Sequence, residues 1–316
     1  MQRRQFVKAI GGLAACAGSR QLFGAEEPYG AVIPGEETWS ESLMLLHFDE
    51  ALSNGISVRV SRYPDKNVTW VWCHVLFEGR MYSFTERRLS CAPTHNTGDL
   101  ATGLYESAGA GISFVRSGPV TQLESMQLSI QNLCHAGGSD QDGPGEIPVV
   151  IEAVFHPVSL KGNPRPGRSE WTGNADIQIS VGGRRQRLTG IAKAHEQTQT
   201  AARFDVPFTY AMTWSETASF IATASSERRN GNLEIGGVDH AVSLFAPGAP
   251  GAVRRFRVVL DSGETLTGTA TRVTRYDVPV FDRMWNGNIV RVELGDHRLI
   301  GMMNDWRPEA NSFDNV

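Results

Sequence analysis

Two histidines are the residues of this 316-residue chain best suited to acid–base chemistry. His195 ends an alternating run, which predicts a place at the end of a strand or at the mouth of a barrel. His74 lies in the run 71–77, and in a strand it would share a face with Trp72 and Leu76. Either side chain could give or take a proton near neutral pH. The alternatives are structural: a ring bonded to a backbone carbonyl for His195, and a hydrogen-bonded core residue for His74.

Asp305, beside Trp306, is the candidate carboxylic acid. A buried carboxylic acid with a raised pKa could protonate an alkene, and aromatic faces could stabilise the carbocation that results. A turn role is the alternative for Asp305, as it is for Asp239 before His240, because Asp readily bonds its neighbouring backbone. The aromatic residues expected at a substrate site, each with a core role as the alternative, are Tyr210, Trp214, Trp285 and Trp306.

The sequence lacks the common motifs for metals and nucleotides. It has no CxxC, and its eight histidines form neither His-x-His nor His-x₃-His, so we expect no metal site. No P-loop, GxSxG or Rossmann motif stands in a supporting strand–helix context, so we expect no cofactor. Export to an oxidising compartment would permit one disulfide, and the sequence leaves open whether any two of Cys73, Cys91 and Cys134 pair.

Residues 1–25 resemble a twin-arginine signal peptide. The run Arg3-Arg4-Gln5-Phe6-Val7-Lys8 has paired arginines, an apolar pair and a lysine, and an apolar stretch over 9–18 follows. That stretch is too short for a membrane helix, which needs about 20 residues. We expect export by the twin-arginine translocase to the periplasm or medium, with cleavage after Ala25. The alternative is a lipid anchor on Cys16, and neither outcome leaves an integral membrane segment.

The net charge argues against a nucleic-acid partner. The whole chain has a formal net charge of −4. Without its first 25 residues, which hold four basic residues and no acidic one, it has 26 basic and 34 acidic residues, a net charge of −8. Such a chain has no broad attraction for nucleic acid or for an anionic membrane.

The body of the chain is predicted to be all-β. Runs such as 55–62 and 80–85 alternate with a period of two, and Gly182-Gly183 predicts a tight hairpin turn. Many short strands of this kind indicate antiparallel barrels or sandwiches. The segment 161–169 contains two prolines and two glycines. We expect it to separate two tandem β-domains, which span residues 35–160 and 170–316.

The second half also resembles a known superfamily. Trp171-Thr172-Gly173, a strand, the Gly182-Gly183 turn and a second strand ending in His195 follow one another, and an aromatic-rich strand pair comes next. This order resembles the lipocalin-like superfamily of carotenoid 1,2-hydratases, attachment-protein-like domains and kievitone-hydratase-like proteins. His195 matches the His of its Gly-x-Gly-x-Arg-Asp-His-Ser-Trp-Gly pattern and Gly190 lies one residue from its first Gly, whereas Ala194 stands where the pattern has Asp.

Both ends of the region 35–310 support the same resemblance. Residues 37–48 resemble the opening strand of the superfamily, and residues 301–306 resemble its closing strand. The resemblance implies two tandem lipocalin-like antiparallel β-barrel or sandwich domains.

With the signal segment, the resemblance leads us to expect an exported enzyme without a redox cofactor. It would hydrate, dehydrate, isomerise or cyclise a lipophilic substrate, isoprenoid or polycyclic, with His195, His74 and Asp305 as the catalytic residues. The first alternative is a periplasmic carrier that binds a hydrophobic small molecule without changing it. The second is a surface or adhesion-type protein anchored through Cys16.

Overall fold

The structure is a computed structural model, and it describes residues 32, 35–107, 111–138, 145–161, 167–204, 206–280 and 283–307. The expected signal segment, residues 1–25 with Cys16, lies outside the described residues. Within the described ranges, regular structure consists of strands and two short 3₁₀ turns, so the predicted all-β class is confirmed. None of the described residues belongs to a helix of the length and apolar character that a membrane crossing requires.

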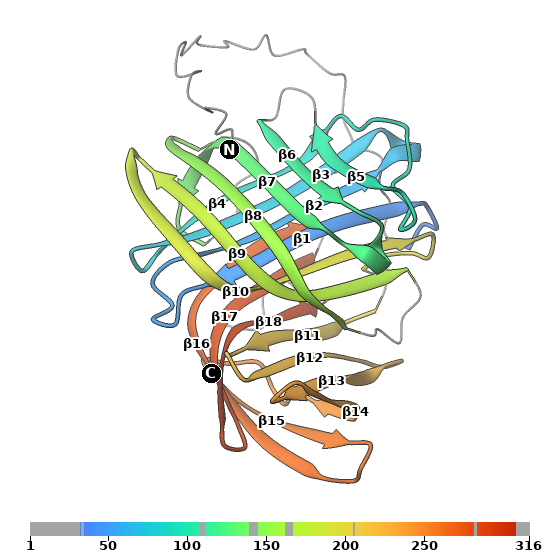
Figure 1. The fold of residues 1–316 in the computed structure, drawn as a ribbon, viewed down its shortest axis with the longest axis vertical. Coiled ribbons are helices and arrows are strands. Elements are labelled where there is room, and N and C mark those ends of the chain that lie inside the picture. Colours follow the sequence, from blue (N-terminus) through green and yellow to red (C-terminus); the bar gives the residue numbers. More distant parts are fainter. Residues whose placement is uncertain are drawn as a thin grey trace, which may run out of the picture.

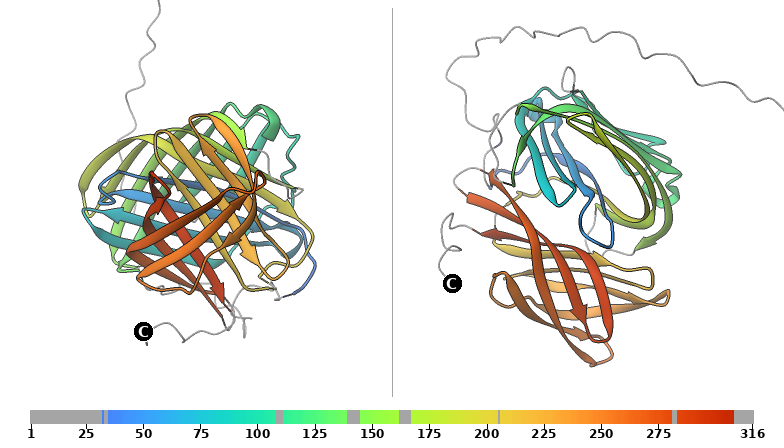
Figure 2. Two further views of the ribbon diagram at one scale, coloured as in Figure 1. Left: turned by 90° about the horizontal axis from the view of Figure 1, so that it is seen from below. Right: turned by 90° about the vertical axis from the view of Figure 1, so that its left-hand side faces the viewer.

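The first ten strands form one antiparallel sheet. They are β1 (Ser40–Phe48), β2 (Gly55–Tyr63), β3 (Val68–Phe77), β4 (Arg80–Leu89), β5 (Thr102–Ser107), β6 (Ile112–Ser117), β7 (Ser125–Ala136), β8 (Ile147–Lys161), β9 (Arg168–Val181) and β10 (Arg184–Gln199). Their order across the sheet is β4-β3-β2-β1-β10-β9-β8-β7-β6-β5. The sheet curls until β4 meets β7, where Tyr82 lies opposite Ala136 and Ser83 opposite His135 (Figures 1 and 2).

The last eight strands close into an antiparallel barrel (Figure 2). They are β11 (Phe208–Trp214), β12 (Ala218–Ser225), β13 (Arg229–Ile235), β14 (Val238–Ala246), β15 (Val253–Leu260), β16 (Thr265–Val280), β17 (Arg283–Leu294) and β18 (His297–Arg307). The barrel closes where β11 pairs with β18.

The change from sheet to barrel comes later in the chain than the composition predicts. β9 pairs with β8 and β10 pairs with β1, so residues 168–199 belong to the ten-stranded sheet. β8 and β9, the strands on either side of the boundary expected between the domains 35–160 and 170–316, instead pair with each other in this sheet. Proline and glycine mark hairpin loops as readily as linkers, which explains the difference. The step between the two units lies between Gln199 and Phe208.

Strand alternation produces three apolar clusters. Odd residues of β1, such as Leu43 and Leu45, pack inside the curled sheet. The barrel interior is filled by side chains that include Phe220, Phe245 and Phe256, with ring centroids 5.4–6.1 Å apart. A third cluster joins the outer face of the sheet to the outer face of the barrel. Its members from the sheet include Met44, Leu46, Trp70 and Trp72, and those from the barrel include Tyr210, Met212, Tyr276 and Trp285.

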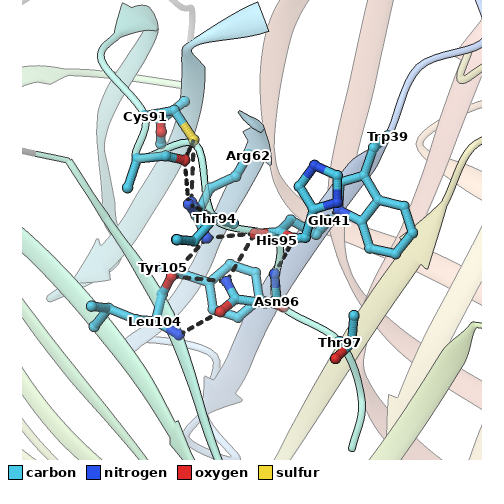
Figure 3. Close-up of polar contacts among 12 residues, drawn as sticks. Trp39, Glu41, Arg62, Cys91, Thr94, His95, Asn96, Thr97, Leu104 and Tyr105 are labelled. Atoms are coloured by element: carbon cyan, nitrogen blue, oxygen red, sulfur yellow. Dashed lines mark hydrogen bonds and ion pairs between the residues drawn. The ribbon is translucent and has the colours of Figure 1, made fainter. Parts of the chain in front are cut away.

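A buried polar cluster also lies inside the curled sheet (Figure 3). Glu41 accepts hydrogen bonds from Trp39 Nε1 at 2.8 Å, from the Asn96 backbone at 2.7 Å and from Arg62 Nη1 at 2.5 Å. Burial raises the pKa of Glu41, and its hydrogen bonds and Arg62 oppose that rise. The ends of Glu41 and Arg62 point inward because each lies on the same strand face as the interior apolar residues. This cluster anchors the loop around Asn96 and lies on the opposite face of the sheet from the barrel.

Candidate active site

A cavity of about 500 Å³ lies between the sheet and the barrel. One wall comes from β1, β2, β3, β9 and β10, and the other comes mainly from β11, β12, β13 and β18, with one residue each from β16 and β17. This volume falls within the range of small-molecule sites, about 300–1,000 Å³. The lining side chains that matter below are Ser57, Arg59, Trp72, His74, Arg168, Glu170, His195, Arg203, Phe204, Phe208, Tyr210, Tyr276, Trp285 and Asn304.

His195 reaches the cavity from β10, where it lies opposite Met44 of β1 and Glu170 of β9. The side chain is only 2% exposed. Neither ring nitrogen has a hydrogen-bond partner among the described residues. Burial is the main cause that holds the pKa of His195 well below its usual value, and the cations Arg168 and Arg59 add to it. His195 is therefore a neutral imidazole with one donor and one acceptor available to a ligand.

His74 enters the same cavity from β3, with its ring stacked on Tyr276 at 3.8 Å. Burial lowers its pKa to about 3. Its Nδ1 lies 3.0 Å from the Ser83 hydroxyl, which itself donates to the Gly137 carbonyl at 3.1 Å. Since that hydroxyl proton is engaged, His74 Nδ1 is the donor to Ser83. Nε2 is then unprotonated, and it has no partner among the described residues.

A buried ion pair stands beside His195. Arg168 Nη2 lies 2.5 Å from Glu170 Oε1, and the Tyr210 hydroxyl donates to the same oxygen at 3.2 Å. The Arg168 guanidinium also lies 4.7 Å above the Tyr210 ring. Burial is the main reason why the pKa of Tyr210 lies well above its usual value, so the phenol keeps its proton. This wall therefore offers a neutral pair, Arg168–Glu170, and a phenol.

Arg59 is a cation without a carboxylate partner in the described part of the chain. Its Nε donates to Ser61 Oγ and its Nη2 to Ser42 Oγ, both at 3.1 Å. Its guanidinium lies 5.6 Å from the Trp72 ring centroid. Burial lowers the pKa of Arg59 to about 10, so it stays charged near neutral pH.

Four of the residues predicted from the sequence meet at this cavity: His195, His74, Tyr210 and Trp285. Trp285 contributes an aromatic wall, with its ring 5.6 Å from that of Trp72.

Asp305, Trp214 and Trp306 are placed elsewhere in the barrel. Asp305 accepts two hydrogen bonds from Arg254 Nη2, at 2.9 and 2.8 Å, and a third from Thr209 Oγ1 at 2.7 Å. It points into the barrel because alternate residues of β18 face opposite sides, and its neighbour Asn304 takes the cavity side.

The two tryptophans are packing residues. The Trp306 ring packs against the Phe204 ring, with ring centroids 5.1 Å apart, and its Nε1 donates to the Phe204 carbonyl at 3.2 Å. Trp214 packs on Phe48 at 6.1 Å, across the interface between barrel and sheet. Neither tryptophan lines the cavity.

Sequence reasoning missed several polar residues of the cavity. Ser57 and Arg59 alternate with Ile56 and Val58, so the period of two did mark them as one polar face. The spacing of residues along the strand could not indicate that the barrel covers this face. Other missed polar residues include Arg168, Glu170, Arg203, Tyr276 and Asn304.

The donors for a metal ion do not gather at this site. In the ranges that the structure describes, no group of three or more His, Cys, Asp or Glu side chains is placed to hold an ion. The polar groups nearest the two histidines are instead phenols and guanidinium groups, with the carboxylate of Glu170 paired to Arg168, and the other two carboxylates of the lining, Glu37 and Glu227, are exposed. The imidazoles, phenols and guanidinium groups suit hydrogen bonding and proton transfer with an oxygen-bearing ligand.

Comparison with known proteins adds the fold and nothing finer. No protein-family model matches the chain, and no curated protein matches it in sequence. Among solved structures, CghA is 11% identical with a TM-score of 0.57, over 92% of this chain and 97% of that chain.

Two further structures are similar. An AttH-like protein from Nitrosomonas europaea is 12% identical with a TM-score of 0.52, over 85% of this chain and 91% of that chain. Kievitone hydratase from Nectria haematococca is 10% identical with a TM-score of 0.50, over 90% of this chain and 92% of that chain. At such low identity these similarities show a shared fold.

Proposed function

We propose that this protein is an exported enzyme that hydrates, dehydrates, isomerises or cyclises a lipophilic substrate, isoprenoid or polycyclic, by acid–base chemistry. The reaction takes place in the cavity between the sheet and the barrel. One observation carries the proposal: His195 and His74 are both buried and neutral, and both have unpartnered ring nitrogens in one aromatic cavity. The shared fold with a protein named as a hydratase supports the same class of reaction.

His195 acts as the general base. In a dehydration it takes a proton from the carbon next to a carbonyl group, and the electron pair moves to the carbonyl oxygen. A hydroxyl on the following carbon then leaves as water with that proton, and hydration is the reverse. A low pKa makes the free imidazole a weak base. The imidazolium nevertheless forms beside a new negative charge, and the attraction between them is strong where water is excluded.

Arg59 stabilises the oxygen that becomes negative, because it has no carboxylate partner in the described part of the chain. Arg59 is close enough to His195 to lower its pKa, so an oxyanion beside His195 lies near this cation, whereas Arg168 is already paired with Glu170. Preorganised donors of this kind account for much of the rate enhancement in such reactions. The Tyr210 phenol, which keeps its proton, supplies a neutral donor to the same region.

Asp305 has no part in this scheme. Its carboxylate is engaged by Arg254 and Thr209 inside the barrel. The proposed reaction therefore begins with proton removal by an imidazole rather than with protonation of an alkene by a carboxylic acid.

Isotope incorporation tests the proposal. The mature protein is incubated with a panel of lipophilic hydroxy-ketones and enones in deuterium- or ¹⁸O-labelled water, and products are analysed by mass spectrometry. We expect one compound to gain label or to change by the mass of one water. The His195→Gln variant should lose this activity, while His156→Gln, an exposed histidine on β8, should keep it. Equal rates in all three proteins would contradict the proposal.

The second candidate is a periplasmic carrier that leaves its hydrophobic ligand unchanged. The low pKa of both histidines favours the carrier, because imidazoles that resist protonation can hydrogen-bond to a ligand without taking a proton from it. A compound that co-purifies with the protein and stays unlabelled in the same experiment would support the carrier.

Export is proposed on the sequence of residues 1–25 alone. A variant with Arg3→Lys and Arg4→Lys should remain inside a bacterial host, whereas the wild type should reach the periplasm. Retention of the wild type in the membrane, lost on Cys16→Ala, would instead support the lipid anchor. Equal distribution of the wild type and the double variant would contradict twin-arginine export.

A further inference from the structure

We propose that the ligand of the cavity is a lipophilic acid, and that Arg59 and Arg203 bind its acidic group. A carboxylate is the simplest such group. This inference deepens the proposed function and rests on it for the place of the ligand. It does not depend on whether the ligand is transformed.

The first observation is the environment of Arg59. The guanidinium bonds only two serine hydroxyls, Ser61 Oγ and Ser42 Oγ. No carboxylate within the described part of the chain lies within salt-bridge distance, and Nη1 makes no hydrogen bond there. Arg59 is only partly exposed, and a guanidinium partly withdrawn from water without an opposite charge is costly. The most direct compensation is a negative charge brought by the ligand.

The second observation is that Arg203, like Arg59, has no carboxylate partner among the described residues. Arg203 Nη2 lies 3.5 Å from the same Ser42 Oγ, so the two guanidinium groups approach one oxygen. Arg203 Nη1 is buried and has no hydrogen-bond partner among the described residues. Two like charges converge here, and no carboxylate pairs with either in the part of the chain that the structure describes.

The neighbouring pair shows the contrast. Arg168 also lies in the cavity wall, but Glu170 neutralises it at 2.5 Å. The fold thus supplies a counter-charge to Arg168 and leaves Arg59 and Arg203 open to the cavity. Paired N–H donors on neighbouring guanidinium groups suit a carboxylate, which has two acceptor oxygens.

The rest of the wall fits the remainder of such a ligand. Trp72, Phe204, Phe208 and Trp285 form an aromatic surface beside the two arginines, with Trp72 and Trp285 5.6 Å apart. A molecule with an apolar body and one acidic end satisfies both parts of the cavity. Such an acid would also offset the positive field that holds His195 neutral, and so make its imidazole a better base.

Paired acids and esters test this inference by binding alone. The mature protein is titrated with cis-parinaric acid and with 2-naphthoic acid, and with the methyl ester of each, by fluorescence. We expect each acid to bind roughly tenfold or more tightly than its ester, as a charge-assisted contact to an otherwise unpaired cation implies. Replacing Arg59 by Met should reduce that preference to about threefold or less while ester affinity is kept.

Three further variants make the result specific. Arg203→Met should reduce the preference as Arg59→Met does, and Arg59→Lys should keep part of it because the charge remains. Arg184→Met removes an exposed arginine paired with Glu78 and should change nothing. Ester binding serves as the check that each variant is folded.

Three results would overturn the inference. They are equal affinity for acid and ester, a preference that survives in both methionine variants, and failure of every acid to bind. If the acids bind as expected but no compound gains label in the isotope experiment, the proposed enzyme is wrong and the acid site stands. If labelling depends on His195 but acid and ester are treated alike, the enzyme stands and the acid site is wrong.

Discussion

Burial of neutral histidines should make this protein lose stability in mild acid, and His74→Asn is the perturbation that isolates one of them. Asn can keep the contact that His74 Nδ1 makes with Ser83 but does not titrate. The comparison is between the unfolding free energies of wild type and variant at pH 7.5 and at pH 5. His156→Asn, at an exposed position, is the matched control.

The sign and size follow from the pKa of His74. In the fold it is about 3, lowered by burial from 6.5. A depressed histidine pKa means that the unfolded chain binds the proton first, so stability is complete above pH 6.5 and falls as the pH drops toward 3. At pH 5 the unfolded imidazole is almost fully protonated and the folded one is not. The loss from His74 is then about 2 kcal/mol. His195 acts in the same direction, since its pKa is also lowered.

Urea unfolding followed by tryptophan fluorescence measures the difference. From pH 7.5 to pH 5, the unfolding free energy of the wild type should fall by about 2 kcal/mol more than that of His74→Asn, so the gap between the two free energies changes by that amount. The buried acids Glu41 and Glu196 have raised pKa values and shift stability in the opposite direction, but they are common to both proteins and cancel. A gap that is the same at both pH values, within about 0.5 kcal/mol, would refute the reasoning about burial.

Two other substitutions test the barrel and the cavity wall. Asp305→Asn should cost about 3–5 kcal/mol of unfolding free energy in urea, because it leaves the buried Arg254 without its counter-charge, and a loss below about 1 kcal/mol would contradict the pairing. Gly287→Ala should weaken binding of 2-naphthoate methyl ester, because a Cβ at that position overlaps the ring of Tyr276, which is stacked on His74. Unchanged ester binding would show that Tyr276 does not shape the cavity.

The sequence predicted the class of fold and part of the site for identifiable reasons. Period-two alternation predicted the strands, and glycine pairs such as Gly182-Gly183 predicted hairpins that the structure contains. The same alternation correctly put His74 on one face with Trp72, since both line the cavity. The alternation could not place Asp305, because an aspartate next to a tryptophan gives the same sequence pattern whether its side chain faces the barrel interior or the cavity.

The place of the cavity could not be predicted, for a physical reason. All nine residues of β1 and all ten of β3 are buried, since one face packs inside the sheet and the other against the barrel. Strands buried on both faces lose the alternation that identifies the core side. The run 161–169 was misleading in the same way, because loops within a unit and linkers between units share a composition.

The polar residues of the cavity explain why the space is there at all. The interior of the barrel is filled by close aromatic contacts, and Met44 and Leu46 pack into the interface between sheet and barrel. The packing opens where Arg59 and His195 interrupt the apolar outer face of the sheet. Burying an unbonded imidazole and half-burying an unpaired cation reduce stability, and an apolar pair of similar size would fill the space at lower cost. Unpaired polar groups gathered around one cavity are typical of a place where a ligand is bound, and the charges left open there indicate an acid.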